Sequence, residues 1–250
     1  MKKTIYYFSA TGNSLQTALD IGEMLGAEVV SIAKSGMNTD CDSDVIGFVF
    51  PTFAWGMPNM VHDFIASGSF NKNAYFFTVV TCGASIGGTA GAVDDLLRKK
   101  GAKLSYGVPL KSVSNYIPMY NVNLGKIEET LKKADVELEK IISDISERKS
   151  NKIGRGLSLV NYMHRKMSEG SKTEDKNYNV SDACNGCGIC ASVCPAKNIE
   201  MTDGRPAFRH NCEHCISCIH WCSKEAINYK NKTQNRNRYH HPKVKAEQLP

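Results

Sequence analysis

Short apolar runs alternate with amphipathic stretches over the first 150 residues of this 250-residue chain. The apolar runs predict five strands, at residues 4–8, 29–32, 45–50, 75–81 and 104–110. The amphipathic stretches predict helices at residues 14–25, 59–66, 87–99 and 127–145. Strands that alternate with helices in this way favour an α/β fold, in which a doubly wound parallel sheet is covered by helices on both faces.

Three loops leave the predicted carboxyl ends of these strands, where doubly wound sheets bind their ligands. The first loop (residues 9–14) is rich in hydroxyl side chains and has a glycine, but it has no lysine or arginine. It would hold a phosphate group through backbone N–H groups, hydroxyls and the start of the following helix. The alternative is an ordinary helix N-cap, for which Thr11 and Ser14 are also suitable.

The second loop (residues 51–58) places Trp55 between Ala54 and Gly56, with prolines on either side. We expect this loop to hold Trp55 away from the core; the alternative is the core packing that is usual for tryptophan. The third loop (residues 81–88) is rich in glycine, so its backbone can approach a ligand closely. Cys82 in the third loop is expected to be a small buried thiol, and Cys41 to be inert.

The first two loops resemble those of flavodoxins. Residues 8–14 resemble the flavodoxin phosphate loop, and residues 51–58 are similar to the loop that lays an aromatic ring on the flavin. The resemblance covers about residues 1–150 and implies a flavodoxin-like fold, with FMN as the cofactor and Trp55 on the isoalloxazine ring. The residues expected to bind FMN are Ser9, Thr11, Gly12, Asn13, Ser14, Pro51, Thr52, Phe53, Ala54, Trp55, Gly56, Thr81, Cys82, Gly83 and Gly87.

The third loop departs from many flavodoxins, because it has no tyrosine to stack on the second face of the flavin. Three arrangements remain open for that face. It is open to a substrate, it is covered by Tyr116 or Tyr120, or it is approached by the C-terminal part of the chain.

Eight of the ten cysteines fall in two copies of one pattern, separated by 28 residues. The first repeat is Cys184-x2-Cys187-x2-Cys190-x3-Cys194, and the second repeat is Cys212-x2-Cys215-x2-Cys218-x3-Cys222. Three closely spaced thiolates suit three corners of an iron–sulfur cube. A zinc site has no use for a third cysteine at the same short step, and a disulfide framework does not persist in reducing cytosol. Ile199 and Ile227 correspond at the same separation and are expected to cover the clusters.

The repeats resemble the two-cluster bacterial ferredoxins, and Pro195 stands where that family has a proline; the second repeat has Ser223 instead. In those ferredoxins the fourth cysteine of each repeat binds the other cluster. The resemblance therefore implies two [4Fe–4S] clusters, each with four ligands. The expected sets are Cys184, Cys187, Cys190 and Cys222, and Cys212, Cys215, Cys218 and Cys194.

Composition divides the chain into four parts. We expect a flavodoxin-like FMN-binding domain at residues 1–150, a linker at 151–180 that could hold a short amphipathic helix at 157–167, a small α+β ferredoxin domain with two [4Fe–4S] clusters at 181–229, and a basic tail at 230–250. Residues 1–150 carry 15 Lys and Arg against 16 Asp and Glu, and the remainder carries 16 against 9. A solvated tail, or one that attracts an acidic redox partner, is favoured over nucleic-acid binding because no recognition motif accompanies the charge.

No hydrophobic run reaches the roughly 18 residues that a membrane span needs, and no secretory signal is evident. The sequence therefore predicts a cytoplasmic protein, and low-potential clusters suggest an anaerobe. His210, His214 and His220 lie among the cysteines, and their expected role is packing or a hydrogen bond to sulfur.

Together the two halves resemble the flavodoxin–ferredoxin fusion family. The resemblance implies an electron-transfer flavoprotein that relays electrons between FMN and two [4Fe–4S] clusters within one chain, with a redox protein as its partner. Two alternatives stay open. One is a flavin-dependent reductase of a small organic substrate, and the other is a redox-responsive protein that binds nucleic acid.

Overall fold

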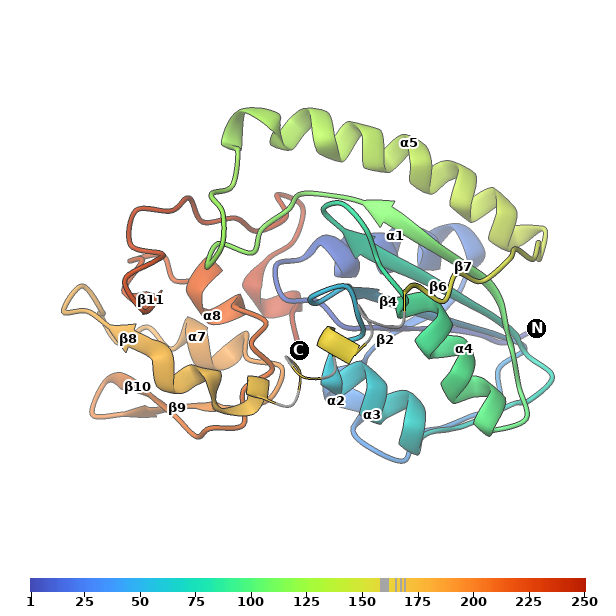
Figure 1. The fold of residues 1–250 in the computed structure, drawn as a ribbon, viewed down its shortest axis with the longest axis horizontal. Coiled ribbons are helices and arrows are strands. Elements are labelled where there is room, and N and C mark those ends of the chain that lie inside the picture. The colour runs from blue at the N-terminus through green and yellow to red at the C-terminus, as the bar shows by residue number, and fades with distance from the viewer. Residues whose placement is uncertain (158–161, 165, 167, 169) are drawn as a thin grey trace.

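A computed structural model of the chain describes residues 1–157, 162–164, 166, 168 and 170–250. Its first half contains a parallel sheet of five strands, which follow one another across the sheet as β2-β1-β4-β6-β7 (Figure 1). The strands are β1 (Lys3–Tyr7), β2 (Glu28–Ser31), β4 (Val45–Pro51), β6 (Tyr75–Cys82) and β7 (Leu104–Lys111). Counted in chain order within the sheet, this is the 2-1-3-4-5 arrangement of the flavodoxin-like fold. The predicted α/β class and the five predicted strands are confirmed.

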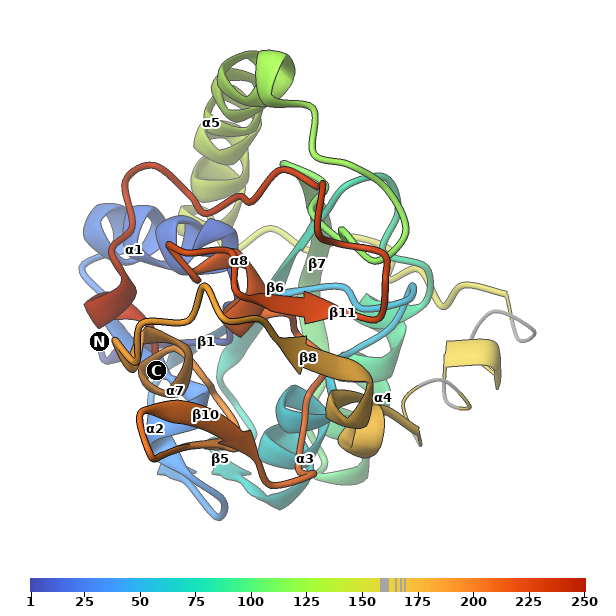
Figure 2. The same cartoon turned by 90° about the vertical axis from the view of Figure 1, so that its left-hand side faces the viewer.

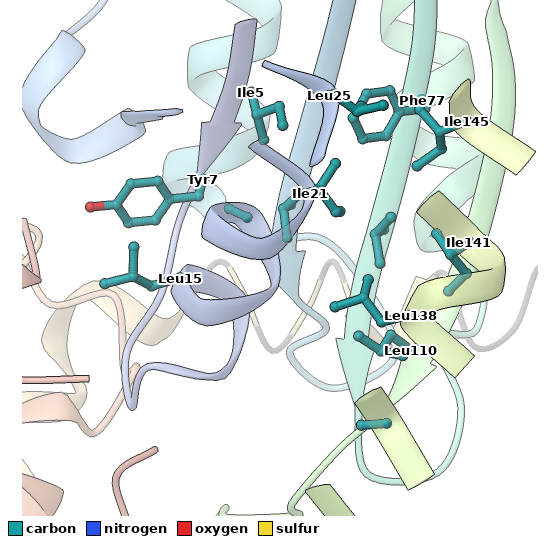
Figure 3. Packing of buried hydrophobic residues seen from close by; sticks show 14 of the residues in the cluster. Ile5, Tyr7, Leu15, Ile21, Leu25, Phe77, Leu110, Leu138, Ile141 and Ile145 are labelled. Atoms are coloured by element: carbon teal, nitrogen blue, oxygen red, sulfur yellow. The ribbon is translucent and has the colours of Figure 1, made fainter. Parts of the chain in front are cut away.

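Two layers of helix cover the sheet because each helix has one apolar stripe. The long helices are α1 (Asn13–Leu25), α3 (Asn59–Ser67), α4 (Thr89–Lys99) and α5 (Ile127–Ser146). In α5 the buried positions are Ala134, Leu138, Ile141 and Ile145, which recur at helical spacing. They pack with Ile21 of α1 on one face of the sheet (Figure 3), whereas α3 and α4 pack on the other face.

Several elements are too short to be predicted from periodicity. They are α2 (Ile32–Ser35), the paired strands β3 (Asp40–Cys41) and β5 (Ser69–Phe70), and the 3-10 turns η1 (Leu124–Lys126), η2 (Ser171–Asn177) and η3 (Ala246–Gln248). Most of the helix predicted at residues 157–167 falls outside the described residues. Among the described residues, no helix combines the length and apolar character needed to cross a membrane.

The cysteine repeats belong to a small α+β unit of short elements. They are β8 (Tyr178–Val180), α7 (Ile189–Ser192), β9 (Ile199–Thr202), β10 (Arg205–Phe208), α8 (Ser217–His220) and β11 (Ile227–Tyr229). Strand β8 pairs with β11, and β9 pairs with β10, both antiparallel. Figures 1 and 2 show that this unit lies against the carboxyl ends of the parallel strands, where the three loops are.

The basic tail (residues 230–250) is not a solvated extension, so that expectation is wrong. Tyr239, Val244 and Leu249 are buried, and the last two join the hydrophobic cluster that contains Leu15 of α1. These apolar side chains are five residues apart, a spacing that belongs to neither helix nor strand periodicity. The tail therefore packs as irregular structure, while its lysines stay at the surface.

Candidate functional site

The three loops are joined by hydrogen bonds at the carboxyl edge of the sheet. Ser14 Oγ of the first loop and Thr81 Oγ1 of the third share a hydrogen bond of 2.7 Å. The Thr52 N–H of the second loop donates to the Thr81 carbonyl at 3.0 Å. The structure thus brings the predicted FMN-binding residues of all three loops into one region.

The first helix begins without a side-chain cap. Gly12 is its N-cap residue, with a φ of 97°, and no side chain caps it by a hydrogen bond. The alternative that Thr11 or Ser14 serves as an ordinary N-cap is therefore wrong. The first N–H groups of a helix have no partner within it, and the first turn of α1 has no acidic residue. This helix start offers N–H donors and the positive end of the helix dipole, which are the groups that bind phosphate. The tail packs against it, since a Cβ atom at Gly12 would lie 2.9 Å from the Cβ atom of His241.

The hydroxyl groups of the first loop are buried and hold the loop in shape. Ser9 Oγ accepts the Gly12 N–H at 3.2 Å, and Thr11 Oγ1 accepts Asn115 Nδ2–H at 2.6 Å. Asn13 Oδ1 accepts the hydroxyl of Tyr239, a tail residue, at 2.6 Å. Asn115 and Tyr239 belong to no recognisable motif, so sequence reasoning missed both.

The second loop presents Trp55 to solvent on a strained turn. Phe53 and Gly56 exchange two backbone hydrogen bonds of 2.9 and 3.0 Å, and the residues between them, Ala54 and Trp55, have φ values of 47° and 64°. Left-handed backbone costs a residue other than glycine roughly 1 to 2 kcal/mol. Trp55 is 48% exposed, so core packing does not account for it. Such strain is typical of functional sites, and an exposed indole can stack on a flat ring.

The third loop packs closely against the backbone of Trp55. Gly87 has a φ of +54°, and a Cβ atom there would lie 2.5 Å from the Trp55 carbonyl oxygen, so only glycine fits. Cys82 is buried as expected, and burial raises the pKa of its thiol.

The two tyrosines considered for the second flavin face have different partners. The hydroxyl of Tyr116 shares a hydrogen bond of 2.8 Å with His214 of the second repeat. The hydroxyl of Tyr120 accepts Ser114 Oγ–H at 2.6 Å.

The eight cysteines of the repeats surround two cavities, with four at each. The first quartet is Cys184, Cys187, Cys190 and Cys222. The second quartet is Cys194, Cys212, Cys215 and Cys218. Each quartet takes three cysteines from one repeat and one from the other, and Ile227 and Ile199 line the respective cavities. No group of three or more His, Cys, Asp or Glu side chains in the described part of the chain is arranged to hold a single metal ion.

Backbone donors and burial both affect the protonation of the cysteines. Backbone N–H groups of Asn198 and Ala226, which correspond at the repeat separation, each donate to a cysteine Sγ (Cys194 and Cys222) at 3.3 Å. Burial raises the pKa of the Cys212 thiol to about 12. The thiol is therefore neutral before metal binds, and ligation has to displace its proton. The N–H donors favour the thiolate that results.

The second repeat makes direct contact with the first loop. Ser217 Oγ–H donates to the Ala10 carbonyl at 2.8 Å, and Trp221 Nε1–H donates to the same oxygen at 3.0 Å. Glu213 Oε2 accepts the Met60 N–H, at the start of α3, at 3.2 Å. The part of the second repeat that carries Cys212, Cys215 and Cys218 is thus fixed beside the first and second loops.

His220 joins the second repeat to two other segments. Its Nε2–H donates to the Asn115 carbonyl at 2.8 Å, and its Nδ1 accepts the Tyr239 N–H at 3.0 Å. Burial lowers the pKa of this imidazole to about 4, so it is neutral at pH 7 and has the Nε2–H tautomer. Since Asn115 also holds Thr11, one chain of contacts runs from the first loop to the cysteine unit.

Comparison with known proteins finds a family match for one short segment of the chain. Residues 179–200, which contain the first repeat, match the protein family described as the 4Fe-4S binding domain. That match supports iron–sulfur binding by the C-terminal unit. No curated protein matches the chain.

Similar solved structures include flavodoxins. A short-chain flavodoxin associated with a bacterial microcompartment is 16% identical, with a TM-score of 0.36, over 57% of this chain and 99% of that one. The two-electron reduced flavodoxin of Megasphaera elsdenii is 19% identical, with a TM-score of 0.33, over 42% of this chain and 83% of that one. A flavodoxin from the domain Archaea is 15% identical, with a TM-score of 0.31, over 57% and 99%. At these identities and TM-scores the likeness carries no argument about this chain, and the fold class rests on the chain's own sheet topology.

Proposed function

We propose that this chain is an electron-transfer flavoprotein that relays electrons between FMN and two [4Fe–4S] clusters. One observation carries the proposal: Ser217 and Trp221, within the second cysteine repeat, both donate hydrogen bonds to Ala10 in the first loop. Such a contact would bring the bound cofactors near each other, which supports electron exchange inside one molecule. FMN exchanges one or two electrons and each cluster exchanges one, so the pair couples two-electron to one-electron carriers.

The proposed flavin site uses the carboxyl edge of the sheet. The uncapped start of α1 and the backbone around Gly12 would hold the phosphate group. Trp55 would pack on one face of the isoalloxazine ring, and the backbone of the third loop would approach its edge. Asn115, although unrecognised in the sequence, would fix the first loop in its binding shape through Thr11.

The proposed clusters occupy the two quartets, one [4Fe–4S] cluster in each. The crossover of one cysteine between repeats and the equivalent N–H donors to Cys194 and Cys222 support this assignment. Each quartet also has three cysteines at short, equal spacing from one repeat, which suits a cluster better than structural zinc. A cluster in such a site supplies one-electron chemistry.

Exposure suggests an order for the relay. Three cysteines of the second quartet, Cys212, Cys215 and Cys218, are buried or half-buried beside the flavin loops, whereas Cys187 of the first quartet is exposed. We assign electron exchange with FMN to the second quartet and exchange with an external redox protein to the first. This order lets a partner reach the chain without approaching the flavin.

Cofactor analysis tests the proposal. The full chain, reconstituted anaerobically with iron, sulfide and FMN, is expected to hold eight irons, eight sulfides and one FMN, because each cube needs four of each inorganic component. Zinc bound in place of iron, or iron at no more than half this amount, would contradict the two-cluster assignment. Failure to retain FMN would contradict the flavin site.

A further inference from the structure

The tail contains a half-buried arginine whose hydrogen bonds are incomplete. Arg238 donates from Nη2 to the Ile227 carbonyl at 3.3 Å and to Asn228 Oδ1 at 2.8 Å. Its Nε and Nη1 atoms are buried and have no hydrogen-bond partner. Two orphaned donors on one guanidinium are unusual, because buried polar groups are nearly always paired.

The charge of Arg238 has no carboxylate at ion-pair distance among the described residues. Glu225 lines the same cavity and attracts the guanidinium only from a greater distance. A guanidinium keeps its proton under all ordinary conditions, and a buried charge without a partner destabilises a fold. A negative charge closer than Glu225 would therefore stabilise the guanidinium.

The surroundings of Arg238 identify that counter-charge. Arg238 and Cys222 line the same cavity. Ile227, whose carbonyl accepts one of the hydrogen bonds of Arg238, lines the cavity of the first quartet together with Cys184 and Cys190. A cluster held by four thiolates carries net negative charge, so a loaded first quartet would supply the missing anion.

We propose that Arg238 is a positioning residue that provides the counter-charge of the cluster in the first quartet and raises its reduction potential. The inference rests on the proposed function. Reduction of the cluster takes one electron from an external reductant and adds one negative charge. A nearby half-buried cation stabilises the reduced form more than the oxidised form, because the attraction grows with the cluster's charge. The tail would then serve both to cover the first loop and to set the potential at which a partner delivers electrons.

Redox titration of the loaded full chain tests this role. The variants are Arg238→Gln, which removes the charge, Arg238→Lys, which keeps it, and Lys243→Gln, which removes an exposed charge from the same tail. Potentials of both clusters are measured by dithionite titration followed by electron paramagnetic resonance. Arg238→Gln is expected to disfavour reduction of one cluster at least about tenfold, which is about 59 mV for a one-electron couple. Arg238→Lys should retain most of the native potential, and Lys243→Gln should change neither cluster, since solvent screens its charge.

Other outcomes would overturn the inference. Unchanged potentials in Arg238→Gln, or an equal shift in Lys243→Gln, would mean that Arg238 is not the counter-charge. A wild-type potential that moves with added sulfate, but not in Arg238→Gln, would assign the pairing to a solution anion. If Arg238→Gln does not load clusters, the test rests on Arg238→Lys. A potential in Arg238→Lys that differs from the native value, although the charge is retained, would contradict the proposal. Iron analysis separates these results from failure of the proposed function, in which the wild-type chain itself would lack clusters.

Discussion

Single side chains connect the cysteine unit to the flavin loops. The two donors to Ala10, Ser217 and Trp221, come from positions where the first repeat has Ile189 and Val193. His214, which bonds to Tyr116, stands where the first repeat has Gly186. The residues that contact the first half are therefore absent from the first repeat. All seven positions between the cysteines differ between the repeats, however, so a comparison of the repeats would not have located the contact surface.

Replacement of Trp221 by Phe tests this junction at one side chain. The variant keeps an aromatic ring but loses the Nε1–H that donates to Ala10 and part of the buried indole. We expect the free energy of unfolding to fall by at least about 1 kcal/mol, because the net value of one hydrogen bond adds to the lost packing. Chemical denaturation followed by circular dichroism measures the change. A conservative substitution at the exposed Met24 of α1 (Met24→Leu) is the control, and an equal loss of stability there would mean that Trp221 has no specific role at the junction.

Replacement of Cys194 by Ser tests the crossover of ligands. Cys194 lies in the first repeat but lines the cavity of Cys212, Cys215 and Cys218. The variant is expected to damage the cluster of the second repeat and to leave the other intact, which iron analysis and paramagnetic resonance would measure. Cys82→Ala is the matched control, because it removes a buried cysteine outside both quartets and should retain eight irons. Selective loss of the cluster of the first repeat would show that the assigned sets are wrong.

Among the elements, the tail differs most from what its sequence suggests. The central strands β4 and β6 were predictable because nearly all of their residues are buried and their apolar runs are continuous. In the tail, charge is dense and the buried side chains Tyr239, Val244 and Leu249 follow no period. Their partners, including Leu15 and Asn13, lie more than 200 residues away in the chain, and no local pattern records such contacts.

The docking of the tail on the first half should become less stable at acidic pH. His241 is buried, and its backbone N–H donates to the Thr11 carbonyl at 2.7 Å. Burial lowers the pKa of its imidazole to about 4. A released tail would titrate near 6.5, so the docked form binds fewer protons between these values. The stabilisation from docking is therefore complete above about pH 6.5 and declines as the pH falls towards 4.

Hydrogen exchange at the tail amides measures this effect. After correction for intrinsic rates, exchange in residues 239–249 should be faster at pH 5.5 than at pH 7.5, and His241→Gln should lose most of the difference. Equal protection at both pH values in the native chain would contradict the assigned role of His241. Exchange in β6, whose strand is buried throughout, serves as the internal reference.

For the whole molecule, the fold class and the cysteine pattern follow from the sequence, whereas the arrangement of the halves does not. Periodicity reports burial along one segment, and ligand spacing reports one loop. The junction depends on single polar atoms, such as the Asn115 side chain on Thr11 and the Asn115 carbonyl on His220, which only the folded chain brings together. In the proposed function, those contacts hold the flavin site and the cluster sites next to each other in one molecule.

The most direct test of the relay follows a single electron within the loaded chain. A brief photochemical pulse that supplies less than one electron per molecule would first reduce clusters, and absorbance would then record transfer to the flavin. If the relay is internal, the transfer rate stays constant when the protein concentration is varied over a roughly tenfold range, because no encounter between molecules is needed. A rate that rises in proportion to protein concentration would mean that the electron passes between molecules, and the account of one chain as a relay would be wrong.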